Sequence, residues 1–220
     1  MKVLAIAAHP DDEVIGAGGT IARHVARGDE VSWCVVTEGY DPPWPKSVLE
    51  EARAQVHQVR ELLGIASVFF CGFPTVNLNT VPCMELSGAL RKVVDQVRPE
   101  IVYTTPPNDV NQDHRLVFES TLVATRPLPG SSVRRLLCYE IGPTTGFGAP
   151  GSASRFAPNV FVDISQFLEK KLQAMRCYKT ELRDFPHPRS LQGIELFSRE
   201  RGLRVGLAAA ECFELIREVS

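Results

Sequence analysis

The chain has 220 residues, and its 24 lysines and arginines against 26 aspartates and glutamates give a formal net charge of −2. No basic stripe stands out and no apolar run is long enough to cross a membrane, so we expect neither a nucleic-acid partner nor a membrane span. The length suits one packed domain, 1–220. The lack of a signal-peptide pattern after Met1 predicts a cytoplasmic protein.

Short apolar runs alternate with amphipathic segments through the first two thirds of the chain. Apolar runs of this length are typical of buried strands, and apolar residues at helical spacing predict helices. Strands are expected at 2–8, 30–36, 67–71 and 101–105, and helices at 14–27, 47–63, 84–97 and 114–125. This alternation predicts an α/β fold, a Rossmann-like three-layer sandwich with a mostly parallel sheet.

The last third of the chain changes character. Further strands are expected at 134–141 and 159–163, and helices at 165–178 and 191–201. The segment 143–158 is poor in charge and rich in small residues and proline, which predicts a mobile loop. It is open whether this loop is a surface linker or covers the active site. The six cysteines form no C-x-x-C pair, and those in strand-like runs are expected to be buried core thiols, namely Cys34, Cys71 and Cys138.

The first expected strand ends in the run His9-Pro10-Asp11-Asp12-Glu13. Three adjacent carboxylates beside a buried strand repel one another and are costly to desolvate unless a positive charge lies among them. A divalent metal would supply that charge, with His9 and Asp12 as ligands and Asp11 left to handle protons. The alternative is a solvated acidic turn that caps the following helix.

A second imidazole is expected at the same edge of the sheet. Parallel sheets bind ligands at the carboxyl ends of their strands, which brings together the loops 8–13, 37–46 and 106–114. His114 follows the fourth strand at the start of a helix, whereas His24 and His57 fall within helical patterns. His9, Asp12 and His114 would leave an open position for water on the metal. The alternative is a helix-capping segment with an incidental histidine.

These motifs resemble the PIG-L/LmbE-like family of zinc-dependent N-acetylglucosaminide de-N-acetylases. The resemblance rests on a strand that ends in AHPDDE, a Gly-rich helix start at 16–19 and a later Asp-His at the head of a helix. It extends to the tail, through Arg189-Ser190, Arg201-Gly202, Gly206 and the run from Ala210 to Phe213.

The resemblance implies a role for each of these residues. His9, Asp12 and His114 match the metal ligands, and Asp11 matches the general base that deprotonates the attacking water. Zinc is the expected ion, although two histidines and a carboxylate also bind Fe²⁺. Glu13 is expected to start the helix or to support the site from behind.

One position departs from the family pattern. Many members have a histidine three residues before the Asp-His histidine, where this chain has Asn111. Asparagine can donate a hydrogen bond to an oxyanion but cannot carry a proton. Either Asn111 suffices, or His187 turns into the pocket from its Pro-His-Pro segment, with Asp113 able to orient its ring.

The sequence therefore predicts a metal-dependent hydrolase that removes an acetyl group from an N-acetylated amino sugar or its conjugate. The partner is expected to be a small molecule, and a homo-oligomer is left open. Two alternatives stay open. One is hydrolysis of another amide, a cyclic imide or an ester on the same metal frame. The other is a non-catalytic sugar- or nucleotide-binding module that uses the Gly-rich turn as an anion cradle.

Overall fold

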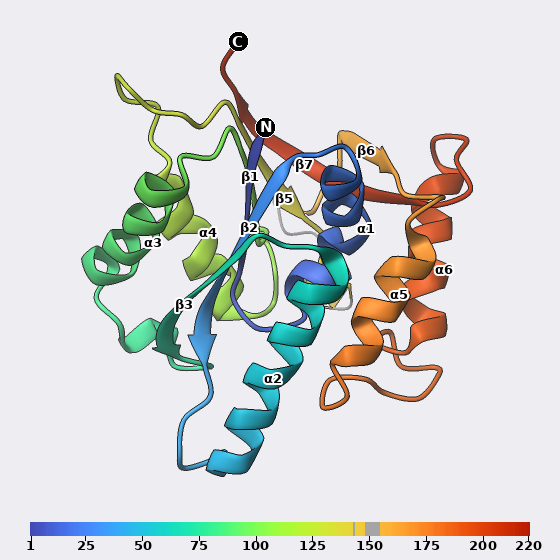
Figure 1. Cartoon of the computed structure of the whole chain (residues 1–220), viewed down its shortest axis with the longest axis horizontal. Helices are drawn as coiled ribbons and strands as arrows, with labels where there is room; N and C mark the ends of the chain where they lie inside the picture. The colour runs from blue at the N-terminus through green and yellow to red at the C-terminus, as the bar shows by residue number, and fades with distance from the viewer. Residues whose placement is uncertain (143, 148–154) are drawn as a thin grey trace.

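The computed structural model describes residues 1–142, 144–147 and 155–220. Within this part of the chain, seven strands form one sheet in the order β3-β2-β1-β4-β5-β7-β6 (Figure 1). Neighbouring strands from β3 to β5 run parallel, whereas β7 lies antiparallel between β5 and β6. The strands are β1 (Lys2–Ala7), β2 (Glu30–Glu38), β3 (Ser67–Pro74), β4 (Ile101–Thr104), β5 (Arg135–Tyr139), β6 (Val160–Asp163) and β7 (Ala210–Glu218).

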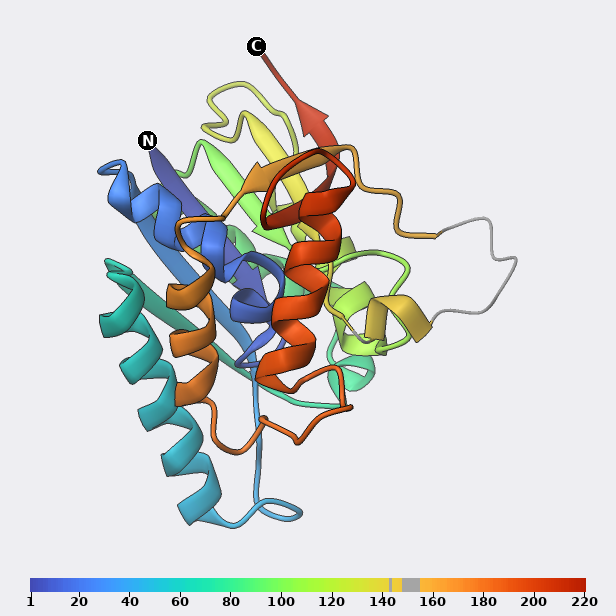
Figure 2. The same cartoon turned by 90° about the vertical axis from the view of Figure 1, so that its right-hand side faces the viewer.

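Helices cover both faces of the sheet. Helices α1, α2, α5 and α6 pack on one face and α3 and α4 on the other (Figures 1 and 2). Two apolar cores result, one on each face, because alternate residues of a strand point to opposite sides. The helices are α1 (Asp12–Ala26), α2 (Lys46–Leu63), α3 (Cys83–Val97), α4 (Gln112–Ala124), α5 (Leu168–Cys177) and α6 (Leu191–Leu203), with 3₁₀ turns η1 (Leu78–Thr80) and η2 (Thr144–Phe147).

The Gly-rich run at the start of α1 allows this helix to lie close against the sheet. A Cβ atom on Gly16 would lie 2.2 Å from Cδ2 of Tyr139, and one on Gly19 would lie 2.8 Å from the side chain of Ile164. Tyr139 in turn donates a hydrogen bond to the carbonyl oxygen of Ile6. The glycines therefore serve close packing, which fixes the start of α1 over the ends of β1 and β5.

The predicted three-layer fold with a mostly parallel sheet is confirmed. The prediction missed β7, whose run AECFELIRE is only half-buried and pairs with residues far away in sequence. Helix α4 begins at Gln112, so that His114 lies inside its first turn. Of the three cysteines expected in the core, Cys34 and Cys138 are buried and Cys71 is half-buried.

Two further expectations concern the surface of the molecule. Much of the predicted mobile loop 143–158 lies outside the described residues. The structure therefore does not test whether this loop covers the site. Among the described helices, none has the length and apolar character needed to cross a membrane.

Candidate metal centre

The turn between β1 and α1 places two buried carboxylates beside His9. Asp11 has φ 102° and ψ −29°, a left-handed conformation that is strained for a residue with a Cβ atom. Its backbone N–H donates to Oε2 of Glu13 at 3.3 Å, and Oε1 of Glu13 accepts from the Tyr178 hydroxyl at 2.8 Å. Glu13 and Tyr178 therefore support the strained turn from behind.

Three donor side chains converge at the end of β1. Nδ1 of His9 lies 3.2 Å from Nε2 of His114, and each nitrogen lies 3.4 Å from an oxygen of Asp12. Two ligands that bind one Zn²⁺ tetrahedrally at 2.0–2.1 Å lie roughly 3.3 Å apart. The structure thus brings together His9, Asp12 and His114 at spacings that suit a single small ion.

A carboxylate stands behind each imidazole. Nε2 of His9 lies 3.0 Å from Oδ2 of Asp113, which also accepts from the backbone N–H of Val76. Nδ1 of His114 lies 3.2 Å from Oδ1 of Asp109, an ion-pair distance without hydrogen-bond alignment. Such carboxylates fix the ring orientation and tautomer of metal-binding histidines. Asp113 was expected to orient His187, but its position at the head of α4 directs it to His9 instead.

The surroundings of the two histidines favour a positive charge at this place. Burial opposes protonation, but contacts with Asp113 and Asp12 raise the pKa of His9 to about 9. Burial likewise opposes protonation of His114, yet the charge of Asp12 and the contact with Asp109 raise its pKa to about 10. The cluster therefore attracts cations, either protons or a metal ion.

Two buried carboxylate oxygens in this cluster have no hydrogen-bond partner. They are Oδ1 of Asp12, which faces His114, and Oδ2 of Asp11. Burial raises the pKa of Asp11 to about 8, although the charge of Arg189 lowers it. Because buried polar atoms are normally paired, these oxygens point to a ligand. An orphaned carboxylate oxygen and two oriented imidazoles fit a divalent ion.

The candidate site borders a pocket of ≈340 Å³, which His9 and Asp11 line. Apolar side chains also line it, among them Trp44, Val48 and Phe70, and α2 contributes much of this lining. The pocket is thus large enough for a small molecule and combines apolar with polar lining.

Asn111 lines this pocket and caps α4. Its Oδ1 accepts from the backbone N–H of Asp113 at 2.9 Å, and its own N–H donates to Asp109 at 2.8 Å. With Oδ1 used in the cap, the Nδ2 group is what the side chain can offer to a ligand. A neutral donor role for Asn111 fits this arrangement.

The structure differs from the prediction that His187 turns into the pocket. The His187 side chain is exposed, and its Nδ1 accepts a hydrogen bond from the backbone N–H of Arg189 at 3.0 Å. This contact holds the imidazole along its own loop. Arg189 lines the pocket from this loop, as do Tyr178, Thr180 and Glu181, and sequence reasoning assigned Arg189 no role.

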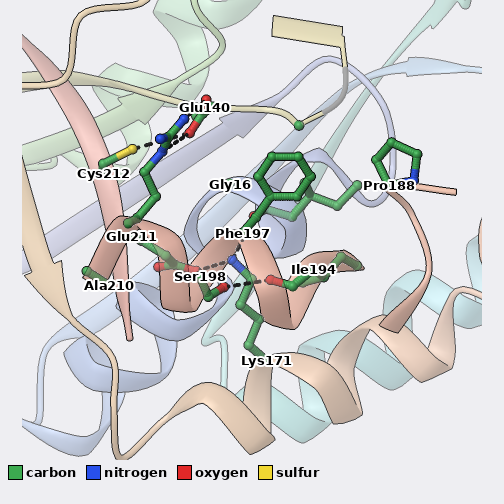
Figure 3. Close-up of a pocket in the computed structure, with 13 residues that line it drawn as sticks. Gly16, Glu140, Lys171, Pro188, Ile194, Phe197, Ser198, Ala210, Glu211 and Cys212 are labelled. Carbon is green, nitrogen blue, oxygen red and sulfur yellow. Dashed lines mark hydrogen bonds and ion pairs between the residues drawn. The ribbon is translucent and has the colours of Figure 1, made fainter. Parts of the chain in front are cut away.

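A second cavity, of ≈40 Å³, lies between α1, α5, α6 and β7 (Figure 3). Lys171 donates to Oε1 of Glu211 and to the carbonyl oxygen of Ile15, both at 2.7 Å. Glu211 also accepts from the backbone N–H groups of Gly19 and Thr20. These bonds tie the middle of α1 to α5 and β7.

The neighbouring charges of this cavity are also paired. Arg201 binds the carboxylate of Glu140 through two nitrogens, at 2.8 and 2.6 Å. Cys212 lies 3.3 Å from the same carboxylate, and burial raises the pKa of its thiol, which makes it unreactive. We therefore assign the second cavity a structural role.

Known proteins that resemble this chain include a family whose matched segment contains the candidate ligands. A sequence model of the family described as PIG-L: GlcNAc-PI de-N-acetylase matches residues 4–125, which include Asp11 and all three candidate ligands. Diacetylchitobiose deacetylase of Thermococcus kodakarensis is 30% identical over 82% of this chain and 70% of its own length.

Two further proteins extend the comparison. The 1D-myo-inositol 2-acetamido-2-deoxy-alpha-D-glucopyranoside deacetylase of Saccharomonospora viridis is 28% identical over 98% of this chain and 95% of its own. The solved structure of N,N'-diacetylchitobiose deacetylase from Pyrococcus horikoshii superposes with a TM-score of 0.78 over 98% of this chain and 84% of its own, at 23% identity. At that identity the superposition shows the fold alone.

Proposed function

The chain belongs to the PIG-L family, and from this premise we propose that it is a zinc-dependent amidohydrolase that removes the acetyl group from an N-acetylated amino sugar or its conjugate. The observation that carries the proposal is the convergence of His9, Asp12 and His114 beside Asp11, whose Oδ2 makes no hydrogen bond and which lines the adjoining pocket. The relatives named as deacetylases of acetylated sugars support the reaction type.

His9, Asp12 and His114 would hold the ion. When bound, the ion would act as a Lewis acid and lower the pKa of water in the site. Zinc is proposed because imidazole and carboxylate ligands suit it, with Fe²⁺ or another divalent ion as the alternative. Asp113 and Asp109 would keep the imidazoles in the orientation that binds it.

Asp11 would carry the proton transfers. Its carboxylate takes a proton from water as the water oxygen attacks the acetyl carbon, and it later delivers that proton to the nitrogen as the C–N bond breaks. One water is consumed, and acetate and a free amine are formed. Asn111 can donate a hydrogen bond to the carbonyl oxygen.

A metal analysis combined with a substrate screen tests the proposal. Purified protein is assayed for bound metal and for acetate release from N-acetylglucosamine conjugates, with and without a chelator. Non-acetylated amides, cyclic imides and esters are included in the screen. Acetate release that a chelator abolishes and Zn²⁺ restores supports the proposal. Turnover of only the non-acetylated substrates would replace it with another hydrolase.

A sugar- or nucleotide-binding module would behave differently. It would contain no tightly bound metal, and its ligand affinity would survive Asp11→Asn without any turnover by the wild type. The cytoplasmic location, the homo-oligomer and the organisation of 1–220 as one domain stay predictions.

A further inference from the structure

The loop between α5 and α6 places one guanidinium beside the candidate base. Nη1 of Arg189 lies 3.5 Å from Oδ2 of Asp11, and both side chains line the same pocket. The Arg189 side chain is 23% exposed, so it is accessible to a molecule in the pocket. Among the described residues that line the pocket, the arginines are Arg189 and Arg53, and Arg53 pairs with Glu38 and lies over the ring of Phe70.

One contact holds the guanidinium of Arg189, and two hold the backbone on which it stands. Its Nη1 donates to Oε2 of Glu181 at 3.0 Å, and its backbone N–H donates to Nδ1 of His187. The next residue, Ser190, caps α6 by accepting from the N–H of Gly193 at 2.9 Å. The guanidinium is therefore positioned before any ligand arrives, which is the arrangement that favours stabilisation of a developing charge.

The contact between Arg189 and Asp11 differs from a closed ion pair. Charge-assisted hydrogen bonds of this kind are about 2.7–2.9 Å long, whereas these atoms lie 3.5 Å apart. Oδ2 of Asp11 makes no hydrogen bond at all. The guanidinium and the carboxylate are thus neighbours in the lining of one pocket, and neither satisfies the hydrogen-bonding capacity of the other.

Amide hydrolysis requires a donor at such a point. Attack of water converts the neutral carbonyl into an oxyanion, which positive donors stabilise more strongly than neutral ones. Asn111 is neutral, and His187 lies along its own loop. Arg189 is the positively charged donor that faces the pocket next to Asp11.

We propose that Arg189 is a catalytic residue whose guanidinium donates to the carbonyl oxygen of the scissile amide as that oxygen becomes negative, with Glu181 and His187 as its positioning residues. This inference rests on the proposed function. It also gives His187 a role that its exposed ring does not suggest, because the Nδ1 contact orients the backbone of Arg189.

The test compares Arg189→Gln and Arg189→Ala with a matched control. Removal of one oxyanion donor typically lowers kcat by about 10²- to 10³-fold. We expect this loss in both variants, with KM and metal content close to those of the wild type. Arg176→Gln removes an equal charge from an exposed position on α5 and should leave all three quantities unchanged.

Two measurements separate catalysis from structural support. Guanidinium chloride at low concentration should restore part of the kcat of Arg189→Ala, whereas ammonium chloride at the same ionic strength should not. Acetate, the product, should bind Arg189→Gln about tenfold more weakly than the wild type in calorimetric titrations, because the variant lacks a charge-assisted donor.

Several results would overturn the inference. Wild-type kcat in Arg189→Gln would remove the donor role, and so would a loss of activity that follows a loss of bound metal or of the folded state. Equal rescue by ammonium would reduce the role to charge alone. If the wild type releases no acetate from any acetylated sugar, the proposed function fails and this inference with it. If the wild type releases acetate and Arg189→Gln has the same kcat, the role of Arg189 is wrong while the proposed function stands.

Discussion

Two clusters of charged side chains lie against α1, one at its start and one along its middle, and they differ in how their polar atoms are satisfied. Around the second cavity, Lys171 meets Glu211 and Arg201 meets Glu140, each in hydrogen-bond contact. At the end of β1, an oxygen of Asp12 and one of Asp11 have no partner among the described atoms. Buried charge alone therefore does not mark a functional site. The unsatisfied carboxylates mark the place for a ligand, and the satisfied pairs mark a structural joint.

The largest expected effect comes from removing a ligand of the unsatisfied cluster. His9→Ala should reduce bound metal from stoichiometric to near zero and abolish turnover, because only His114 and Asp12 would remain as donors. Metal content measured by mass spectrometry, with circular dichroism to verify folding, checks this. His57→Ala removes an exposed imidazole from α2 and serves as the control. Full metal content in folded His9→Ala would place the ion elsewhere.

Asp11→Asn should separate chemistry from metal binding. The substitution keeps the volume of the side chain but removes the proton acceptor, so we expect kcat to fall by roughly 10²- to 10⁴-fold. Metal content should stay at the wild-type level, because Asp11 is not among the three converging donors. Steady-state kinetics together with metal analysis decides the matter. Near-wild-type turnover would assign the base to another residue.

A substitution in the satisfied cluster should lower the stability of the protein and leave its metal content unchanged. Lys171→Met leaves Glu211 buried without its cation, and breaking a buried pair in this way costs about 3–5 kcal/mol in the free energy of unfolding. Urea denaturation of metal-free protein measures it. Lys170→Met, an exposed neighbour on α5, is the matched control. Equal stabilities of the two variants would contradict the structural role of the pair.

The sequence predicted the unsatisfied cluster better than the satisfied one, for a physical reason. His9, Asp12 and His114 follow strands whose parallel order could be inferred from the alternation of apolar runs, and parallel strands end at one edge. Lys171 and Glu211 meet because β7 inserts antiparallel beside β5, a pairing that no local pattern of the chain indicates. The sequence likewise did not indicate the orientation of His187 or the position of Arg189 beside Asp11, because both depend on contacts of a loop without regular secondary structure.

The carboxylates that contact the two imidazoles, Asp113 and Asp109, are expected to affect metal affinity although they are not among the proposed ligands. Asp113→Asn keeps the size of the side chain but weakens the contact with Nε2 of His9. Loss of such a partner typically weakens metal affinity by about 10- to 100-fold. Competition with a chromogenic chelator measures the affinity, and Asp95→Asn on the exposed side of α3 is the control. Unchanged affinity would show that Asp113 serves only the backbone N–H groups of Val76 and Leu78, which donate to its carboxylate at 2.7 and 3.4 Å.

The smallest expected effect concerns the support behind Asp11. Tyr178→Phe removes the hydroxyl that donates to Glu13, whose other oxygen accepts from the backbone N–H of Asp11. Burial raises the pKa of Glu13 well above its usual range, so this is a bond between neutral groups. Such a hydrogen bond contributes about 0.5–1.5 kcal/mol, part of which should appear as lower stability. The remainder should appear as a lower kcat with unchanged metal content, because a looser Glu13 allows the left-handed turn at Asp11 to relax. Urea unfolding and steady-state kinetics on the same variant measure the loss of stability and the loss of kcat separately.

A variant that loses stability but keeps full kcat would show that the strained turn holds Asp11 without help from Tyr178.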